Sequence, residues 1–160
     1  MRGVALQRHR SRVPALSRSS SIPSYVQPCD PVLRKVPPSG DQWLYEIKWD
    51  GYRAQLHIRA GDITVYSRKG FNWTDQFAAI AQAAKKLRVR EAIIDGEAVV
   101  LGSKGIADFQ SPRRELRKEH SDKLTYYVFD LLWLNGKDSR GLPLVERARK
   151  MTIEQVRFVG

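Results

Sequence analysis

Short stretches of alternating hydrophobic and polar residues recur along the chain, and this period of two predicts β-strands. Residues 53–59 and 63–67 alternate in this way on either side of Ala60-Gly61-Asp62, a combination typical of a β-hairpin. Residues 43–49 predict another strand, which ends at the turn-forming pair Asp50-Gly51. This part of the chain is therefore expected to form antiparallel sheet.

Two later segments are apolar on both faces, which is consistent with strands buried inside a sheet. Residues 92–101 form the first of them and are closed by a turn over residues 102–105. Residues 124–134 form the second and end at Asn135-Gly136.

A helix is predicted where apolar residues recur at helical spacing between Trp73 and Leu87. Asn72 can cap its start, and the basic residues within 85–88 lie at its carboxyl end, where the helix dipole favours cations. Residues 108–119 predict a charged surface helix.

Pro143 is well placed to begin a last helix, which we expect to run into the C-terminus. Strands linked by hairpins, with helices between them, indicate an α+β domain with a mainly antiparallel sheet. A chain of 160 residues is long enough for one such domain with a real core. Residues 1–27 show little hydrophobic periodicity, so we expect a disordered basic tail followed by a folded region over 28–160.

The chain is basic, with 28 Lys and Arg, 17 Asp and Glu, and a formal net charge of +11. Five arginines and no acidic residue lie within residues 1–27. This surplus favours a polyanionic partner such as nucleic acid, although ribosomal and membrane-surface proteins share it. The Arg- and Ser-rich start is also typical of an organellar transit peptide, but we favour a plain linker.

The single cysteine, Cys29, excludes an internal disulfide and a cysteine metal cluster, which suits a reducing cytoplasm. The three histidines lack metal-ligand spacing, and His57 is expected to be a packed or surface strand residue. No apolar run is long enough to cross a bilayer, and no phosphate-binding Gly-x-x-x-x-Gly-Lys-Ser/Thr loop occurs. We therefore expect a cytoplasmic protein without a membrane partner.

Charge is concentrated in the segment Glu46-Ile47-Lys48-Trp49-Asp50-Gly51-Tyr52-Arg53. Alternate residues of a strand share a face, so Glu46, Lys48 and Asp50 should point one way and the apolar residues the other. Lys48 would then lie between two carboxylates, with Arg53 following a glycine turn. An ordinary solvated strand face with an ion pair explains this segment equally well when it is taken alone.

Two later segments favour a functional site over an ordinary ion pair. In Asp95-Gly96-Glu97, two acids interrupt an apolar strand, and buried carboxylates are costly without cations or hydrogen-bond donors. Gly96 would let a backbone or a ligand approach closely, and the alternative is a turn with Asp-Gly at its tip. Phe129 is one aromatic residue in an apolar strand, where a core position is the simplest interpretation.

Four motifs therefore follow one another, and they are Lys48-x-Asp-Gly-x-Arg53, Ser67-Arg68-Lys69-Gly70, Asp95-Gly96-Glu97 and Phe129-Asp130-Leu131-Leu132. This series resembles the motifs of covalent nucleotidyltransferases, which include ATP-dependent DNA ligases, RNA ligases and mRNA capping enzymes. The residues around the motifs, over 28–150, are most similar to the ligase domain of bacterial end-joining DNA ligases. The resemblance implies a partial ATP-grasp-like nucleotidyltransferase domain that seals DNA breaks in DNA repair and recombination.

The resemblance also implies how the reaction starts. Lys48 would attack the α-phosphorus of ATP, release pyrophosphate and carry AMP, while Glu46 would contact the adenine edge. An amine attacks only when it is deprotonated, and nearby carboxylates favour the protonated form. Metal and nucleotide should therefore both be needed for activation.

The other site residues come from the later motifs. Arg53 and Arg68 would hold ribose and phosphate oxygens, a task that suits the planar guanidinium. Phe129 would stack on the adenine, and Glu97 would bind a ribose hydroxyl or help to hold magnesium. The implied cofactors are ATP and Mg²⁺, and the implied partners are nicked or broken duplex DNA and end-joining repair proteins.

The chain departs from the family pattern after its fourth motif. It contains no Glu-Gly-x-Val-x-Lys segment, no Lys-x-Lys segment and no following OB-fold domain, so we expect a C-terminally truncated domain. Two alternatives stay open. One is an RNA ligase or mRNA capping guanylyltransferase, and the other is an inactive truncated remnant that binds nucleic acid.

Overall fold

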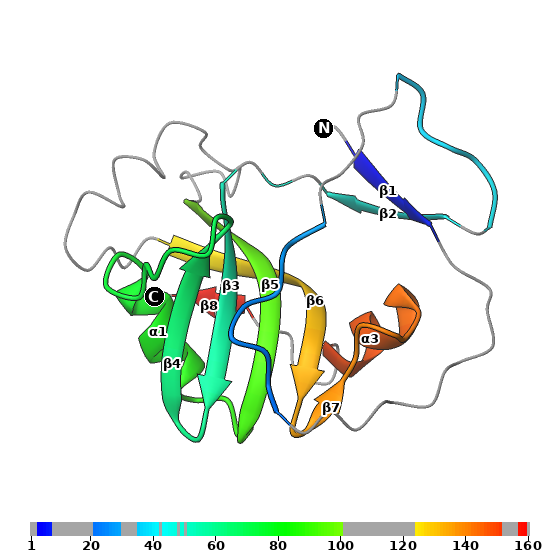
Figure 1. Cartoon of the computed structure of the whole chain (residues 1–160). Coiled ribbons are helices and arrows are strands. Elements are labelled where there is room, and N and C mark those ends of the chain that lie inside the picture. The colour runs from blue at the N-terminus through cyan, green and yellow to red at the C-terminus, as the bar shows by residue number, and fades with distance from the viewer. Residues whose placement is uncertain are drawn as a thin grey trace.

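An antiparallel sheet forms the centre of the fold (Figure 1). In the computed structural model, the described residues are 3–7, 21–29, 35–41, 43–47, 49, 51–100, 124–151 and 157–159. Among them, six strands form this sheet in the order β4-β3-β5-β6-β7, and β8 also pairs with β6. The strands are β3 (Tyr52–Arg59), β4 (Asp62–Ser67), β5 (Glu91–Val100), β6 (Leu124–Leu134), β7 (Lys137–Asp138) and β8 (Arg157–Val159). The predicted α+β class with a mainly antiparallel sheet is confirmed.

Strands β3 and β4 form the predicted hairpin. Their pairing ends with Arg59 opposite Asp62, so the loop contains only Ala60 and Gly61. Both loop residues have positive φ, 50° and 96°, as a two-residue type I′ loop requires. This loop is favoured because its twist matches that of the two strands.

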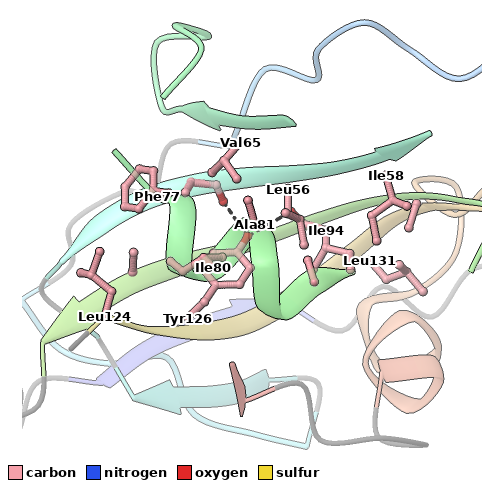
Figure 2. Close-up of a cluster of buried hydrophobic side chains, with 14 of the residues drawn as sticks. Leu56, Ile58, Val65, Phe77, Ile80, Ala81, Ile94, Leu124, Tyr126 and Leu131 are labelled. Carbon is pink, nitrogen blue, oxygen red and sulfur yellow. Dashed lines mark hydrogen bonds between the residues drawn. The ribbon is translucent and has the colours of Figure 1, made fainter. Parts of the chain in front are cut away.

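The main core lies between one face of the sheet and helix α1 (Ala78–Ala84), as Figure 2 shows. Alternate residues of β3 point into it, together with residues of β5, β6 and α1. Its fully buried members include Leu56, Phe77, Ile80 and Tyr126. The Tyr126 hydroxyl donates to the backbone oxygens of Ala54, at 2.8 Å, and Ile94, at 3.1 Å. This buried polar group is therefore satisfied, and it ties β6 to β3 and β5.

Helix α1 is shorter than the predicted helix between Trp73 and Leu87, and Asn72 does not cap it. The Asn72 carboxamide oxygen instead accepts hydrogen bonds from the backbone N–H and the hydroxyl of Thr74. The Trp73 N–H donates to the Val65 oxygen at 2.8 Å, so this part of the chain continues the pairing along β4. The Trp73 oxygen accepts the Phe77 N–H at 3.0 Å, so residues 74–77 form turns that lead into α1 and regular helix starts only at Ala78.

Residues 21–29, which we call the strap, cross the face of the sheet opposite α1 (Figure 1, blue). The Gln55 side chain pairs with the Val26 peptide through two hydrogen bonds of 3.0 and 2.9 Å. Arg59 donates to the Pro23 oxygen at 2.7 Å. Ile22 and Val26 pack on a second cluster made by Ile93, Leu132 and Trp133.

The expected disorder of residues 1–27 is therefore wrong for the part of this segment that the structure describes. Besides the strap, β1 (Gly3–Gln7) pairs antiparallel with β2 (Trp43–Ile47) in a two-stranded sheet. Peptide groups make many of the contacts of the strap, and a row of apolar side chains is not needed. The strap therefore has almost no hydrophobic periodicity. A search for periodicity does not detect such a segment.

His57 lies beneath the strap and is buried, as expected for a packed strand residue. Its Nε2 lies 2.8 Å from Gln55 Oε1, and its ring meets Tyr66 edge-on with centroids 4.8 Å apart. Gln55 uses its amide N–H as a donor to the strap, so we assign the proton of the neutral imidazole to Nε2. Burial, aided by the positive charge of Arg59, lowers the pKa of His57 to about 4.

This pKa predicts that acid destabilises the fold. In the unfolded chain His57 titrates near its usual pKa of about 6.5, so the unfolded state binds more protons between that value and about 4. Stability contributed by the neutral ring is present above pH 6.5 and is lost as the pH falls. We expect a loss of about 2 kcal/mol in the free energy of unfolding from pH 7 to pH 5. Denaturant unfolding of the wild type and of His57→Gln tests this, because only the wild type should show the loss; equal slopes would contradict it.

The C-terminal elements follow the prediction only in part, because the last helix ends at Met151 and residues 157–159 form β8, which pairs with β6, where a continuing helix was expected. Strand β6 has the predicted bounds and ends at Asn135-Gly136, and α3 (Leu144–Met151) begins just after Pro143. Arg147 of α3 donates to the Asp130 carboxylate at 3.0 Å and so holds the helix against β6. The turn over 102–105 and the helix over 108–119 lie outside the described residues. None of the helices in the described part of the chain is long and apolar enough to cross a membrane.

Candidate functional site

Arg53 and Asp95 form a two-pronged ion pair on the strap side of the sheet. Arg53 Nε and Nη2 donate to the two carboxylate oxygens of Asp95 at 3.2 and 2.8 Å. The Asp95 side chain is only 4% exposed, so water does little to solvate its charge. Burial opposes the charge on Arg53, but the hydrogen bonds and the negative charge of Asp95 outweigh burial and raise the pKa of Arg53.

Three separate segments meet at the Arg53 guanidinium. Besides Asp95 on β5, the Cys29 oxygen at the end of the strap accepts a hydrogen bond from Arg53 Nη1 at 3.0 Å. Phe129 on β6 lies with its ring centroid 5.1 Å from the Arg53 Cζ atom, a cation–π distance. Phe129 is half-buried and faces this cluster, so the simple interpretation of it as a core residue is wrong.

Glu97 is fixed next to this cluster. It lies opposite Arg53 in the pairing of β3 and β5, and its Oε1 accepts the Gly51 N–H at 3.1 Å. Gly51 approaches β5 so closely that an added Cβ would lie 2.2 Å from the Ala98 oxygen. Trp49 stacks on Tyr127 of β6 with ring centroids 3.8 Å apart. Trp49 and Gly51, which flank Lys48 and Asp50 within the lysine motif, are therefore held against β6 and β5, beside Glu97.

Lys48 and Asp50 themselves lie outside the described residues. Glu46 belongs to β2 and its backbone pairs with Val4, but its side chain is outside what the structure describes. The shared face of Glu46, Lys48 and Asp50 therefore stays a prediction.

Arg68 lies in a loop at the rim of the cluster. The Tyr25 hydroxyl of the strap donates to the Arg68 oxygen at 2.7 Å. Burial raises the pKa of Tyr25, and Asp95 raises it further, while Arg53 and Arg68 act in the opposite direction. The strap thus contacts both parts of the site, since Tyr25 bonds to the Arg68 loop and the Cys29 oxygen accepts from Arg53.

Sequence reasoning missed the role of Asp95 in this cluster. The motif was identified and its buried acids were seen to need partners, but Arg53 could not be named as the partner of Asp95 from spacing. The alternative of a turn at Asp95-Gly96 is wrong, because β5 runs through both residues with only a register shift against β6. Gly96 is needed for close approach, since an added Cβ would lie 2.5 Å from the Tyr127 oxygen.

A metal would find few protein ligands here. The described residues contain no group of three or more His, Cys, Asp or Glu side chains that could hold a metal ion. Glu97 is the one predicted metal ligand. A single carboxylate fits the way magnesium usually binds, with water and substrate phosphates completing its coordination.

Comparison with known proteins places the chain in a family. The family described as ATP dependent DNA ligase domain matches residues 22–155. The chain belongs to this family. The match begins within the strap, in agreement with the contacts that join the strap to the sheet. The resemblance to DNA ligases that the four motifs indicated is confirmed.

Individual relatives agree with the family. The multifunctional non-homologous end joining protein LigD of Pseudomonas aeruginosa is 32% identical over 130 residues, covering 81% of this chain but 15% of LigD. A DNA ligase of Aeropyrum pernix is 34% identical over 129 residues, covering 75% of this chain and 21% of the ligase. The chain therefore spans only a small part of the length of these relatives.

Solved structures support the fold. A mycobacterial DNA ligase D complexed with ATP and MES has a TM-score of 0.60 and 29% identity, over 68% of this chain and 35% of the other. The ligase domain of Mycobacterium tuberculosis LigD gives a TM-score of 0.59 at the same identity and coverage. The expected nucleotidyltransferase fold, present in part, is confirmed.

Proposed function

We propose that this chain carries the part of an ATP-dependent DNA ligase that binds ATP and accepts AMP on Lys48. The observation that carries the proposal is the meeting of Arg53, Asp95 and Phe129, with Glu97 fixed alongside by Gly51. These residues come from three of the four family motifs and from β3, β5 and β6. Membership of the ATP-dependent family supports ATP as the nucleotide.

The reacting group in this proposal is the Lys48 amine. Its nitrogen forms a bond to the α-phosphorus of ATP, the bond from that phosphorus to the bridging oxygen breaks, and pyrophosphate leaves with the electron pair. The amine gives up one proton to water, so the product is a phosphoramidate with an uncharged nitrogen and one negative charge on its phosphate. Chemistry of this kind depends mostly on positioning and charge stabilisation. Magnesium, held by the phosphates with Glu97, would supply positive charge at the phosphates and favour the neutral amine.

The remaining residues bind and orient the nucleotide. Phe129 would stack on the adenine, and Glu46 would read its edge. Arg53 and Arg68 would donate to ribose and phosphate oxygens. Three of the five N–H groups of Arg53 already bond to Asp95 and Cys29, so Arg53 is held in one orientation before a nucleotide arrives. Such preorganisation reduces the entropy that binding must overcome.

The acceptor in the proposal is a nicked or broken DNA duplex. Relatives named DNA ligase, and others named for non-homologous end joining, support DNA over RNA or an mRNA cap. End-joining repair proteins are the partners that these names favour. We also propose that the protein works in the bacterial cytoplasm, on the nucleoid.

Incubation with magnesium and ATP labelled at the α-phosphate tests the first step. We expect wild type to retain label covalently and Lys48→Ala to retain none, because no other amine replaces the nucleophile. Lys85→Ala is the matched control; this exposed lysine follows α1 and should not affect labelling. A folded wild type without label, or label on Lys48→Ala, would contradict the proposal. A preference for GTP would favour the capping alternative.

A further inference from the structure

The loop between β4 and α1 displays an aromatic side chain to solvent. Phe71 is 61% exposed, and among the described large hydrophobic residues only Val36 and Tyr45 are comparably exposed. The Tyr45 hydroxyl bonds to the Pro38 oxygen, so that ring has a local partner. Phe71 immediately follows the Ser67-Arg68-Lys69-Gly70 motif. A single exposed ring is not by itself an interaction surface, so the surroundings of Phe71 decide what the ring can bind.

The backbone of this loop is held firmly, although Phe71 is exposed. The Ser67 N–H donates to the Phe71 oxygen at 2.9 Å, and the Phe71 N–H donates to Ser67 Oγ at 3.2 Å. The Gly70 N–H donates to the Ser67 oxygen at 2.8 Å, and Gly70 has a φ of 79° that suits glycine. Tyr25 clamps the loop from the strap through the Arg68 oxygen. A ring carried by such a loop loses little backbone entropy when it binds.

The charge beside the ring identifies a polyanion as the partner. Arg68 and Lys69, which immediately precede Gly70, are both exposed. Cations attract backbone phosphates, and aromatic rings stack on bases, so the combination is typical of nucleic-acid contacts. The strap links this loop, through Tyr25, to Arg53, through Cys29, and the reacting end of the DNA has to reach the Arg53 cluster if the proposed function holds.

The ring adds selectivity that charge cannot provide. Inside an intact duplex both faces of each base pair are covered by the neighbouring pairs. At a nick or an end one stacking contact is interrupted, so a base face can become accessible to a flat side chain. Phosphates, by contrast, are present along the whole duplex and attract cations without regard to breaks.

We propose that Phe71 stacks on a base at the break in the DNA, and that Lys69 holds a nearby backbone phosphate. Phe71 then makes the protein prefer broken over intact duplex, while Lys69 contributes affinity for both. This inference rests on the proposed function, and it adds a determinant of substrate choice outside the nucleotide-binding residues.

Competition between two DNA circles of one sequence tests the inference. One circle is relaxed and covalently closed, and the other carries a single nick. Wild type is expected to prefer the nicked circle. Phe71→Ala should lose about tenfold in affinity for the nicked circle and little for the closed one. Phe71→Tyr should keep the preference, and Phe71→Leu, which keeps apolar bulk without a ring, should lose it.

Lys69→Ala should weaken binding to both circles to the same extent and lower the salt dependence by about one phosphate contact. Lys85→Ala removes the same charge from another exposed position and is the matched control. A wild type that shows no preference overturns the inference, and so does a Phe71→Ala variant that keeps the preference or weakens both circles equally. If Phe71→Ala does not fold, the comparison of Phe71→Tyr with Phe71→Leu decides.

Labelling with ATP separates this inference from the proposed function. Phe71→Ala should accept AMP as the wild type does, because Phe71 lies outside the four motifs that supply the nucleotide-binding residues. Absence of label on the wild type contradicts the proposed function. Normal labelling together with unchanged DNA preference in Phe71→Ala contradicts only the inference made from the loop.

Discussion

Gly96→Ala should lower the free energy of unfolding by about 3 kcal/mol or more. The added methyl group would lie 2.5 Å from the Tyr127 oxygen and 2.7 Å from Cζ of the Tyr126 ring. Neither neighbour can yield easily, since Tyr127 belongs to the paired backbone of β6 and the Tyr126 hydroxyl bonds to both Ala54 and Ile94. Overpacking a core typically costs about 1–3 kcal/mol, and a clash with paired backbone belongs at or above the upper end.

Denaturant unfolding measures this change. Gly141→Ala is the matched control, because an added Cβ at Gly141 would meet nothing within 4 Å and its φ is not in the left-handed region. That variant should stay within about 0.5 kcal/mol of the wild type. A Gly96→Ala protein as stable as the control would show that β5 and β6 are not packed as closely as described.

Removal of the Asp95 carboxylate should have the second large effect on the free energy of unfolding. Asp95→Ala should destabilise the fold by about 2–3 kcal/mol, because Arg53 loses both of its hydrogen bonds to β5 and keeps a partly buried charge. The value is below that for a fully buried pair because the Arg53 side chain is 22% exposed and water can solvate it in part. The guanidinium should also leave the Phe129 ring, so labelling by ATP should need a higher nucleotide concentration.

A double-mutant cycle separates this pair from the general effects of truncation. Arg53→Ala, Asp95→Ala and the double variant should give a coupling energy of about 2 kcal/mol. The same cycle on Arg140 and Asp138, a more exposed pair with a 2.6 Å contact, should give less than about 1 kcal/mol. If the two coupling energies are equal, Asp95 does not hold Arg53 in the way we describe.

Local sequence determined most of the sheet. Residues 124–134 are mostly apolar on both faces and end at a glycine turn, and β6 has these bounds because such a segment is stable only when it is buried. The hairpin at Ala60 and Gly61 was predictable for a similar reason, since few short loops fit the twist of two antiparallel strands. Periodicity and turn residues act over a few neighbours, so they can be read in order along the chain.

Local sequence failed where distant hydrogen bonds decide the structure. The helix predicted from Trp73 begins at Ala78, because Asn72 and Trp73 bond along β4 instead. The strap was expected to be disordered, because its order depends on Gln55 and Arg59, which lie about 30 residues further along the chain. Propensity contains no information about such partners.

The candidate site divides in the same way. The four motifs identified Arg53, Glu97 and Phe129 as candidate site residues from the sequence alone, because each motif has a fixed order of residues. Only the tertiary structure brought Phe129 beside Arg53 and gave Asp95 its partner, since these residues lie on different strands and meet through the pairing of β3, β5 and β6. The sequence by itself thus determined which chemical groups are present, and the strand register decided which of them touch.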